Sequence, residues 1–261
     1  MVFKRGKKMK KLQSLKNLRN KLKSGASIGS WIQISNSTIS EIVGSSGYDW
    51  AAVDLEHGQI SYESLPDIFR SLELGNTLPL ARLAEASSVD CKRVLDAGAV
   101  GLIIPKIESS KQLIEMRDAS SWPPAGKRGV GFSRANLFGK YFDEYSIESQ
   151  NPFLVAMIES KKGLENIDEI IKVKGLDAIF IGPYDLSASI GKTGEFNSKS
   201  FADSINLIKE KCKNNRVPCG IHVVQPSPKD LDIRINEGYK FIAYSMDTMH
   251  LRQGLESVFI K

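Results

Sequence analysis

The sequence predicts an α/β protein with the (β/α)₈ barrel fold, on three observations. Eight short and almost entirely apolar segments recur along 261 residues, as in parallel strands that are buried on both faces. A helix-like segment follows each of them, and eight such units in a chain of this length are typical of one barrel. Glycines stand just before several of the strands, where helices often end in a left-handed residue. An open, doubly wound sheet remains the alternative, because alternation of strands and helices does not by itself show closure.

The expected elements follow one another at a steady pace. Segments such as FLVAMI and AIFI are too short and too apolar for surface helices, whereas the segments between them mix polar and apolar residues at helical spacing. The strands are expected at residues 27–34, 50–55, 78–83, 101–107, 153–158, 178–181, 220–224 and 241–245. The helices are expected at 38–46, 61–74, 88–96, 109–119, 162–173, 185–190, 201–215 and 228–237, with one more at the C-terminus. The glycines expected to end helices are Gly47, Gly75, Gly98, Gly175 and Gly238.

The basic residues are distributed unevenly. The net charge is +6, but residues 1–23 hold ten of the 36 basic residues and no acid, which leaves 26 basic against 30 acidic residues in the rest. Leu12, Leu15, Leu18 and Leu22 recur at helical spacing and predict an amphipathic helix lying on the body. We therefore expect a basic N-terminal arm and helix over 1–23 and a single barrel domain over 24–261. A nucleic-acid-binding arm is the alternative, but no aromatic residue interleaves the lysines after Phe3 to stack on bases.

Features that are absent from the sequence indicate the cellular compartment and the kinds of partner. No apolar run approaches the roughly 20 residues of a membrane span, and no signal-peptide core is found near the start. The three cysteines, Cys91, Cys212 and Cys219, are too scattered for a disulfide framework or a zinc site. We expect a cytoplasmic protein with no membrane span and no nucleic-acid partner.

Residues 120–152 interrupt the regular pattern of strands and helices. This connection is long for a barrel and contains Pro123-Pro124 together with the cations Lys127, Arg128 and Arg134. One hypothesis is a lid that brings positive charge to an anionic substrate. The alternative is an ordinary surface excursion.

Polar side chains gather where the apolar strands end. The stretch AAVDLEHG, residues 51–58, ends a strand with Asp54, Glu56 and His57. In barrels of this kind the residues at the carboxyl ends of the strands face the active site. The candidates at these positions are Trp31, Asp54, Glu56, His57, Arg82, Lys106, Glu159, Asp185, His222 and Gln225.

Glu159 and Asp185 end consecutive strands, so their carboxylates are expected close together. Two unpaired carboxylates in a cleft repel each other unless a cation lies between them. Ligation by oxygen with few protein donors suits Mg²⁺ or Mn²⁺. The alternative pairs each carboxylate with an arginine or with a helix N-terminus, and Asp185 is itself placed to cap the helix that follows.

His57 is the candidate general base, because histidine is the usual proton acceptor near neutral pH and Asp54 is close enough in sequence to hold its tautomer. Arg82 ends an apolar strand, where a guanidinium needs an anion, and it can equally pair with Asp54 or Glu159. Lys106 offers a Schiff-base alternative, which two nearby carboxylates disfavour by keeping it charged. His222 faces the barrel interior only if the strand register is as expected.

Several segments together resemble one known family. GSWIQ, GYDWAAVDLEHG, the Arg82 strand, LDAGA, PPAGKRGVGFSRAN, MIES and GPYDLSASIG occur in this order. From about Leu22 to the last helix, the chain resembles the HpcH/HpaI family of metal-dependent class II pyruvate aldolases. The resemblance implies reversible cleavage of a 4-hydroxy-2-oxo acid, of the 2-keto-3-deoxy type, to pyruvate and an aldehyde through a metal-stabilised enolate.

The resemblance also implies roles for individual residues. It makes Glu159 and Asp185 ligands of Mg²⁺, Mn²⁺ or Co²⁺, and His57, supported by Asp54, the proton-transfer group. It makes Arg82 the residue that stabilises the enolate. It further implies a trimer or hexamer in which the C-terminal helix packs on a partner barrel and Asp96 reaches the histidine of a neighbouring subunit. Substrate contacts are implied for Trp31, Gly182, Pro183, Tyr184, Asp185 and His222.

Three residues depart from the pattern of the family. Met157 stands where a glutamine is usual, Lys106 replaces a methionine, and His222 replaces an aliphatic residue at the aldehyde side of the pocket. These departures leave the aldehyde unidentified. They also keep two alternatives open, a catalytically impaired barrel that binds pyruvate or another keto acid, and oxaloacetate decarboxylase-type activity at the same site.

Overall fold

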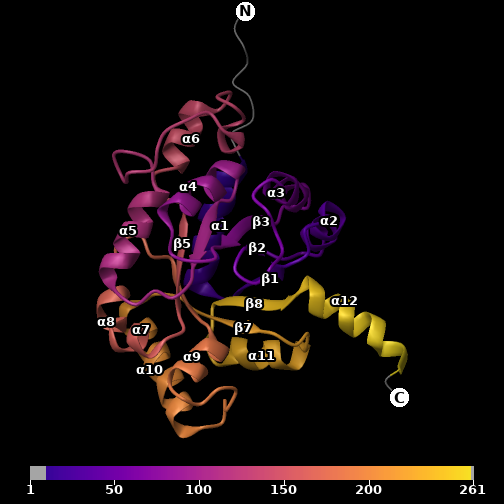
Figure 1. Ribbon diagram of the computed structural model, residues 1–261, viewed down its shortest axis with the longest axis vertical. Helices are drawn as coiled ribbons and strands as arrows, with labels where there is room; N and C mark the ends of the chain where they lie inside the picture. The colour runs from indigo at the N-terminus through magenta and orange to yellow at the C-terminus, as the bar shows by residue number, and fades with distance from the viewer. Residues whose placement is uncertain (1–9, 260–261) are drawn as a thin grey trace, which may run out of the picture.

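The computed structural model describes residues 10–259, and the side chains of residues 14–259. Eight parallel strands pair in chain order, and β8 returns to pair with β1, which closes the barrel (Figure 1). The predicted (β/α)₈ barrel is therefore confirmed, and the open doubly wound sheet is excluded. Lys4, Arg5, Lys7 and Lys8 of the predicted basic arm lie outside the described residues.

The strands match the predicted positions to within a few residues at their ends. They run over Ser27–Ile32 (β1), Trp50–Asp54 (β2), Leu78–Arg82 (β3), Gly101–Ile104 (β4), Phe153–Ile158 (β5), Ala178–Ile181 (β6), Cys219–Val223 (β7) and Phe241–Met246 (β8). Alternate side chains of each strand enter two different cores, one inside the barrel and one between the strands and the helices. Burial on both faces explains the almost continuous apolar character of the strands.

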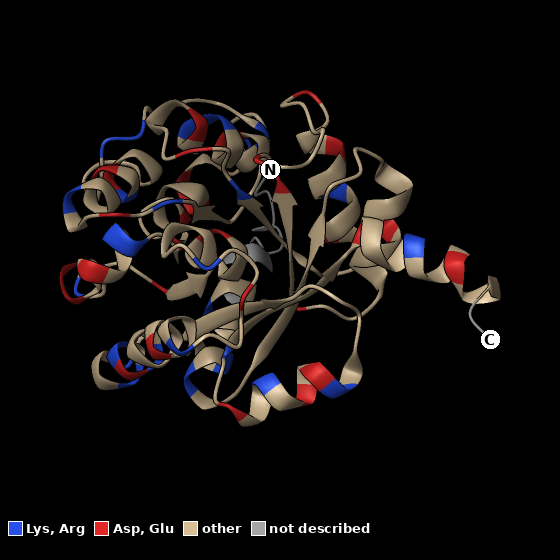
Figure 2. Ribbon diagram, turned by 60° about the horizontal axis from the view of Figure 1, so that its bottom comes forward, with Lys and Arg blue, Asp and Glu red and all other residues tan. Residues whose placement is uncertain are grey.

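The helices surround the barrel, and charged residues lie mainly on them rather than on the strands (Figure 2). Serine or asparagine side chains cap several helix starts, for example Ser87, Ser109 and Ser227, each accepting a backbone N–H from the first turn. The helices are Lys10–Ser24 (α1), Ser37–Ser45 (α2), Leu65–Leu74 (α3), Ser88–Ala97 (α4), Ser110–Ser120 (α5), Phe142–Glu148 (α6), Lys161–Glu165 (α7), Ile167–Ile170 (α8), Pro183–Ser189 (α9), Lys199–Asn215 (α10), Pro228–Asn236 (α11) and Asp247–Glu256 (α12). Two 3₁₀ turns, Arg134–Asn136 (η1) and Ser257–Phe259 (η2), complete the described elements.

Helix α1 closes the amino end of the barrel. Its buried leucines Leu15, Leu18 and Leu22 belong to the same cluster as Trp50 and Phe241, which begin β2 and β8. The leucine spacing thus marks a face that packs into the barrel interior. The opposite end of the barrel, where the strands have their carboxyl ends, is not covered by α1 and can hold a functional site.

Helix ends follow the glycine pattern with one exception. Gly47, Gly98, Gly175 and Gly238 have positive φ, as expected, but Gly75 has a φ of −85° and Asn76 takes the left-handed conformation instead. Gly75 is needed for a different reason, because a Cβ there would lie 2.0 Å from the carbonyl oxygen of a neighbouring helix residue.

The long connection between α5 and β5 packs as a unit of its own. Trp122 and Tyr145 form a small separate cluster, and the buried Arg128 donates to the Tyr145 hydroxyl at 2.7 Å. Arg134 pairs with Glu73 at 3.0 Å. Figure 1 shows α6 beyond α4, at the other end of the view from α9. The surface-excursion hypothesis therefore describes this segment within the chain better than a lid over its own site.

Helix α12 extends away from the barrel (Figure 1). Leu251, Leu255, Val258 and Phe259 on this helix and the following turn are all at least half exposed. Among the described residues, no helix is long and apolar enough to cross a membrane.

Candidate active site

A cavity of about 280 Å³ opens at the carboxyl ends of the strands. It lies at the end of the barrel opposite to α1. Ten of the predicted site residues line it, namely Trp31, Asp54, His57, Arg82, Glu159, Gly182, Pro183, Tyr184, Asp185 and His222. The cavity is near the lower end of the usual size range of small-molecule sites, which starts at roughly 300 Å³.

Arg82 forms the centre of one side of the cavity. It ends β3 next to Asp54, which ends β2, and the two residues are register partners. Its Nε and Nη2 donate to the Asp54 carboxylate at 2.7–2.9 Å, and its Nη1 lies 2.8 Å from the Glu56 carboxylate. Of the two partners considered for Arg82, Asp54 and Glu159, the structure therefore shows Asp54.

Asp54 is fully buried, and its carboxylate has every acceptor position engaged. It also accepts the side-chain amide of Gln33 at 3.0 Å and the backbone N–H groups of Glu56 and His57 at 3.0 and 3.1 Å. Burial alone raises the pKa of Asp54, but the hydrogen bonds and charge of Arg82 outweigh it and leave the pKa below its ordinary value. Asp54 is therefore a fixed anion.

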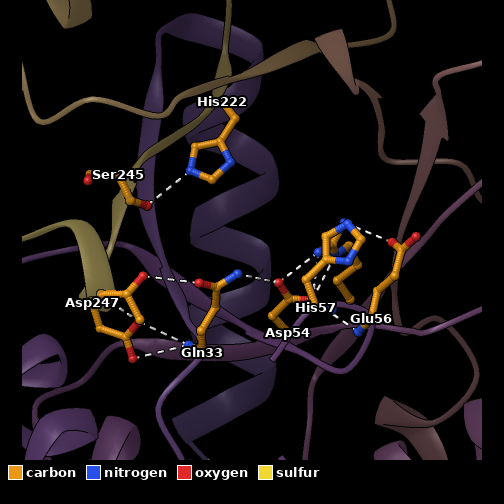
Figure 3. Close-up of polar contacts among 9 residues, drawn as sticks. Gln33, Asp54, Glu56, His57, His222, Ser245 and Asp247 are labelled. Carbon is orange, nitrogen blue, oxygen red and sulfur yellow. Dashed lines mark hydrogen bonds and ion pairs between the residues drawn. The ribbon is translucent and has the colours of Figure 1, made fainter. Parts of the chain in front are cut away.

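His57 is exposed, and its ring lines the cavity (Figure 3). Asp54 holds the backbone N–H of His57, and among the described residues no hydrogen bond joins the Asp54 carboxylate to the His57 ring. The expectation that Asp54 sets the tautomer of His57 is therefore corrected, because Arg82, Gln33 and two backbone N–H groups already occupy its oxygens. Asp54 instead fixes the turn that carries His57.

Glu159 lies on the other side of the cavity, directly after β5. It is buried, and its Oε1 accepts the backbone N–H of Lys106 at 2.7 Å. Burial raises the pKa of Glu159 to about 7, with the neighbouring charges of Glu56 and Asp185 adding to the effect and the Lys106 N–H opposing it. This carboxylate lies near two other carboxylates, and among the described residues no ion pair joins it to a cation, although the charge of Arg82 acts on it from further away.

Asp185 and the residues before it complete that side. Gly182 precedes α9, and a Cβ added to it would lie 2.5 Å from Glu159 Oε2, so only glycine lets the backbone pass this close to the carboxylate. Pro183 begins α9, and the exposed Asp185 lies in its first turn. The short strands β5 and β6 thus bring Glu159 and Asp185 to one wall, as their positions at consecutive strand ends predict.

Trp31 and Phe180 form an apolar wall of the cavity, and the ring of His222 lies against it. The Trp31 ring stacks on Phe180 at a centroid separation of 5.7 Å and lies 5.2 Å from the His222 ring. The strand register places His222 inside the barrel, which answers the question left open by the sequence.

Four predicted residues lie outside the cavity lining, namely Glu56, Asp96, Lys106 and Gln225. Glu56 pairs with Arg82 next to the cavity, and Gln225 is exposed after β7. Asp96 is on α4, half-buried, and Arg128 and Lys92 are the charges that act on it, so it is not part of this cavity within one chain. Lys106 has a left-handed backbone with a φ of 46°, and its side chain is exposed outside the cavity lining. Its backbone N–H, rather than its ammonium group, contributes to the site.

Gln33 is the functional candidate that sequence reasoning missed. Its amide donates to Asp54, while its Oε1 accepts from Thr248 at 3.0 Å (Figure 3). It stands directly after the apolar segment SIGSWI, so the rule that identified the other strand-end residues applies to it equally.

The Glu159 wall suits a divalent cation. Its donors are carboxylate oxygens, and a cation would offset the burial and the repulsion by Glu56 and Asp185 that together raise the pKa of Glu159. Among the described residues, no group of three or more His, Cys, Asp or Glu side chains is placed to hold a metal ion. Mg²⁺ is commonly bound by one or two protein carboxylates, and substrate and water complete its coordination shell.

Comparison with known proteins gives consistent results over nearly the whole chain. The model of the HpcH/HpaI aldolase/citrate lyase family matches residues 27–254. The chain is 33% identical over 230 residues to the 5-keto-4-deoxy-D-glucarate aldolase of Escherichia fergusonii, covering 88% of this chain and 89% of that protein. It is 30% identical over 250 residues to the hydroxypyruvate/pyruvate aldolase of Roseobacter denitrificans, covering 95% and 97%. A crystal structure of an HpcH/HpaI aldolase/citrate lyase family protein from Burkholderia cenocepacia has a TM-score of 0.86 and 26% identity, covering 94% of this chain and 99% of that one.

Proposed function

Since the chain belongs to the HpcH/HpaI aldolase/citrate lyase family, we propose that it is a carbon–carbon lyase that splits a 4-hydroxy-2-oxo acid reversibly into pyruvate and an aldehyde. The aldolases among its relatives cover most of this chain at 30–33% identity. The observation that carries the proposal is the division of one cavity into a wall with Glu159 and Asp185 and a wall with Arg82 and His57.

Cleavage of such an acid leaves negative charge on the pyruvate fragment. Arg82 is held by Asp54 and Glu56 with its guanidinium at the cavity wall, so it provides a preorganised positive group for that charge. Because its orientation is set before substrate binds, no reorganisation is needed during the reaction.

Removal of the 4-hydroxyl proton requires a base. The imidazole of His57 lines the cavity, and no described residue forms a hydrogen bond with its ring. Its backbone is held by Asp54, the same carboxylate that binds the guanidinium of Arg82. We assign to His57 the transfer of this proton.

Glu159 and Asp185 would hold the divalent cation, Mg²⁺, Mn²⁺ or Co²⁺. Bound there, the cation would supply Lewis-acid stabilisation of the oxygen atoms of pyruvate. The backbone at Gly182, Pro183 and Tyr184, which starts α9, bounds the same wall and would orient the pyruvate carboxylate.

A catalytically impaired keto-acid-binding barrel is the second candidate, and Met157 favours it. Its thioether lines the cavity next to Glu159 where the polar amide of glutamine would otherwise contact substrate. The two candidates differ in one observable, the exchange of pyruvate methyl protons with D₂O, which needs enolate formation but no aldehyde.

The test is proton NMR of pyruvate in D₂O with purified protein and Mn²⁺ or Mg²⁺. The proposed aldolase exchanges the methyl protons, and His57→Ala and Glu159→Ala remove the exchange. Exchange that persists in EDTA would contradict the role given to the metal site, and no exchange with either metal would favour the binding-only barrel.

We further propose a homo-oligomer, a trimer or a hexamer, in which α12 packs on another copy. The apolar side chains of Leu255, Val258 and Phe259 are 65–84% exposed at the end of a helix that extends away from the body. A double substitution, Leu255→Glu with Phe259→Glu, is expected to lower the mass measured by light scattering. Ile147→Glu, at another exposed apolar residue, is the control. An unchanged mass in the double variant would argue against α12 as the interface.

A further inference from the structure

His222 is a polar residue on an otherwise apolar wall. Its neighbours in the cavity lining include Trp31, Phe180, Val224 and Met246, none of which carries an acceptor directed at a substrate hydroxyl. A polar atom on such a wall is unfavourable unless water or a ligand forms a hydrogen bond with it. The position of His222 in the pocket therefore raises the question of what its ring recognises.

The tautomer of His222 follows from one contact. Its Nε2 lies 3.0 Å from the carbonyl oxygen of Ser245, and a carbonyl oxygen only accepts, so Nε2 carries the proton. Loss of hydration lowers the pKa of the ring to about 4, against the opposing effect of the Ser245 hydrogen bond. The ring is therefore neutral, and Nδ1 is an acceptor.

The backbone of β8 is distorted where it makes this contact. The pairing of β1 with β8 shifts register between Gly29 and Trp31, and Ser245 has a φ of 56°. Positive φ is uncommon for a residue other than glycine and costs conformational free energy. This irregularity in β8 directs the Ser245 carbonyl at His222. The strained backbone of Ser245 therefore keeps the proton on Nε2 of His222.

The remaining ring nitrogen faces the reactive side of the pocket. Figure 3 shows Nδ1 on the side of the ring away from Ser245, facing the part of the cavity where His57 and Asp54 lie. Among the described residues, no hydrogen bond to Nδ1 is present. An acceptor held in place and left without a donor suits a hydroxyl group of the substrate.

We infer that His222 is a specificity-determining residue whose Nδ1 accepts a hydrogen bond from a hydroxyl group of the aldehyde fragment, so that the enzyme takes hydroxylated rather than simple alkyl aldehydes. This rests on the proposed aldolase function and adds the chemical class of the second substrate. A hydroxyl has the donor that Nδ1 lacks, whereas a methyl group at the same place leaves Nδ1 unpaired.

The first test compares two matched aldehydes as acceptors in the aldol reaction with pyruvate. Glycolaldehyde and acetaldehyde differ only in the hydroxyl, and the ratio of their kcat/KM values cancels effects common to both. We expect this ratio to fall about tenfold in His222→Leu, which corresponds to one neutral hydrogen bond, and to be partly restored in His222→Asn, whose amide oxygen accepts. Val224→Leu changes the same wall without removing an acceptor and is expected to keep the ratio of the wild type. Equal ratios in the wild type and His222→Leu would overturn the inference.

The second test does not need turnover, and so it distinguishes failure of this inference from failure of the aldolase function. The chain has three histidines, and ¹⁵N NMR of labelled protein resolves protonated from unprotonated ring nitrogens, with His222→Asn identifying the His222 signals. We expect an unprotonated Nδ1 whose resonance shifts on adding pyruvate with glycolaldehyde, and does not shift with acetaldehyde. A protonated Nδ1, or the same response to both aldehydes, would refute the role of His222. Absence of pyruvate proton exchange together with the expected shift would refute only the catalytic proposal.

Discussion

Two groups of carboxylates lie in or next to the same cavity, and they are compensated in different ways. Asp54, which ends β2, and Glu56, which follows it, meet the guanidinium of Arg82 at 2.7 and 2.8 Å. Glu159, after β5, meets a backbone N–H of Lys106 and the negative charges of Glu56 and Asp185. The pKa of Asp54 lies below its ordinary value, and the pKa of Glu159 is raised to about 7.

The difference shows that one pocket can accept negative charge on one side and a cation on the other. On the Arg82 side the protein supplies its own cation and fixes it rigidly, so this side is complete before any ligand arrives. On the Glu159 side the fold collects negative charge and leaves the compensation to a ligand. A divalent cation is the natural ligand, because it neutralises more than one carboxylate at once.

Removing a carboxylate from the uncompensated side is expected to have the largest effect. Glu159→Gln keeps the shape and removes the charge that holds the cation, so we expect kcat/KM for pyruvate formation to fall about a thousandfold, since Lewis-acid stabilisation supplies several kcal/mol. The measurement is coupled detection of pyruvate at saturating Mn²⁺. Glu165→Gln, on the exposed surface of α7, is the matched control. Activity of Glu159→Gln within tenfold of the wild type would contradict the assignment of the metal side.

Removing the cation from the compensated side should cost stability in addition to activity, and the loss of stability is the effect predicted here. Arg82→Met leaves the buried Asp54 charge without its partner, and we expect the free energy of unfolding to fall by about 3–5 kcal/mol. Urea denaturation monitored by circular dichroism measures the change. Arg93→Met, which removes a surface arginine stacked on Tyr62, is expected to cost less than about 1 kcal/mol.

A double variant checks that this cost comes from the unpaired charge. Asp54→Asn added to Arg82→Met removes the isolated anion, so the double variant should lose less stability than the two single changes added together. Additive losses would show that the two residues are not coupled and would undermine the comparison of the two sides.

The third prediction concerns pH in the absence of metal. The pKa of Glu159 is raised from its ordinary value of 4.5 to about 7, so the folded state holds this proton more tightly than the unfolded state does. The stabilisation is fully present below pH 4.5 and is lost as the pH rises to 7, which amounts to roughly 3 kcal/mol. Urea denaturation in EDTA should show the wild type losing about that much more than Glu159→Gln between pH 4.5 and 7.5.

Mn²⁺ should reverse this loss, because it compensates the ionised carboxylate. The increase in melting temperature on adding Mn²⁺ to the wild type is expected to be larger at pH 7.5 than at pH 5. Parallel stability profiles of the wild type and Glu159→Gln would show that Glu159 is not protonated in the folded protein near neutrality.

The smallest effect is expected from Glu56, which acts on both sides. Glu56→Gln removes one of the two ion pairs of Arg82, at a cost of about 1 kcal/mol, since the carboxylate is near the surface. It also removes one of the charges that raise the pKa of Glu159. The pH-dependent loss of stability should therefore end at a lower pH in this variant than in the wild type, as measured by the same titration. A shift to higher pH would show that the two groups do not interact as described.

Much of the fold and of the pocket lining was predictable because it depends on local patterns. Strands buried on both faces need continuous apolar runs. A polar residue at the end of such a run, such as Glu159 or Arg82, is therefore expected at the mouth of the barrel. Gln33 satisfies the same pattern and was identified only from its contacts with Asp54 and Thr248.

The partners of these residues were less predictable, because hydrogen bonds depend on geometry between strands. Asp54 stands three residues before His57 in the chain, yet its carboxylate is occupied by Arg82 from β3 and Gln33 from β1. The cations of the connection between α5 and β5 have the composition of a lid, but Arg128 is used for packing against Tyr145.

The barrel, the positions of its strands and the residue types at their carboxyl ends follow from the amino-acid sequence, because apolar periodicity and chain order fix which side chains are buried and which emerge. The pairing of the charges, in contrast, depends on the folded arrangement of the strands. This arrangement pairs Arg82 with Asp54 and Glu56, and in the part of the chain that the structure describes it forms no ion pair with Glu159. It also turns the Nδ1 of His222 toward the pocket through a strained residue on another strand. These outcomes depend on distances of a few ångströms between strands far apart in the chain, and such distances arise only when the barrel closes.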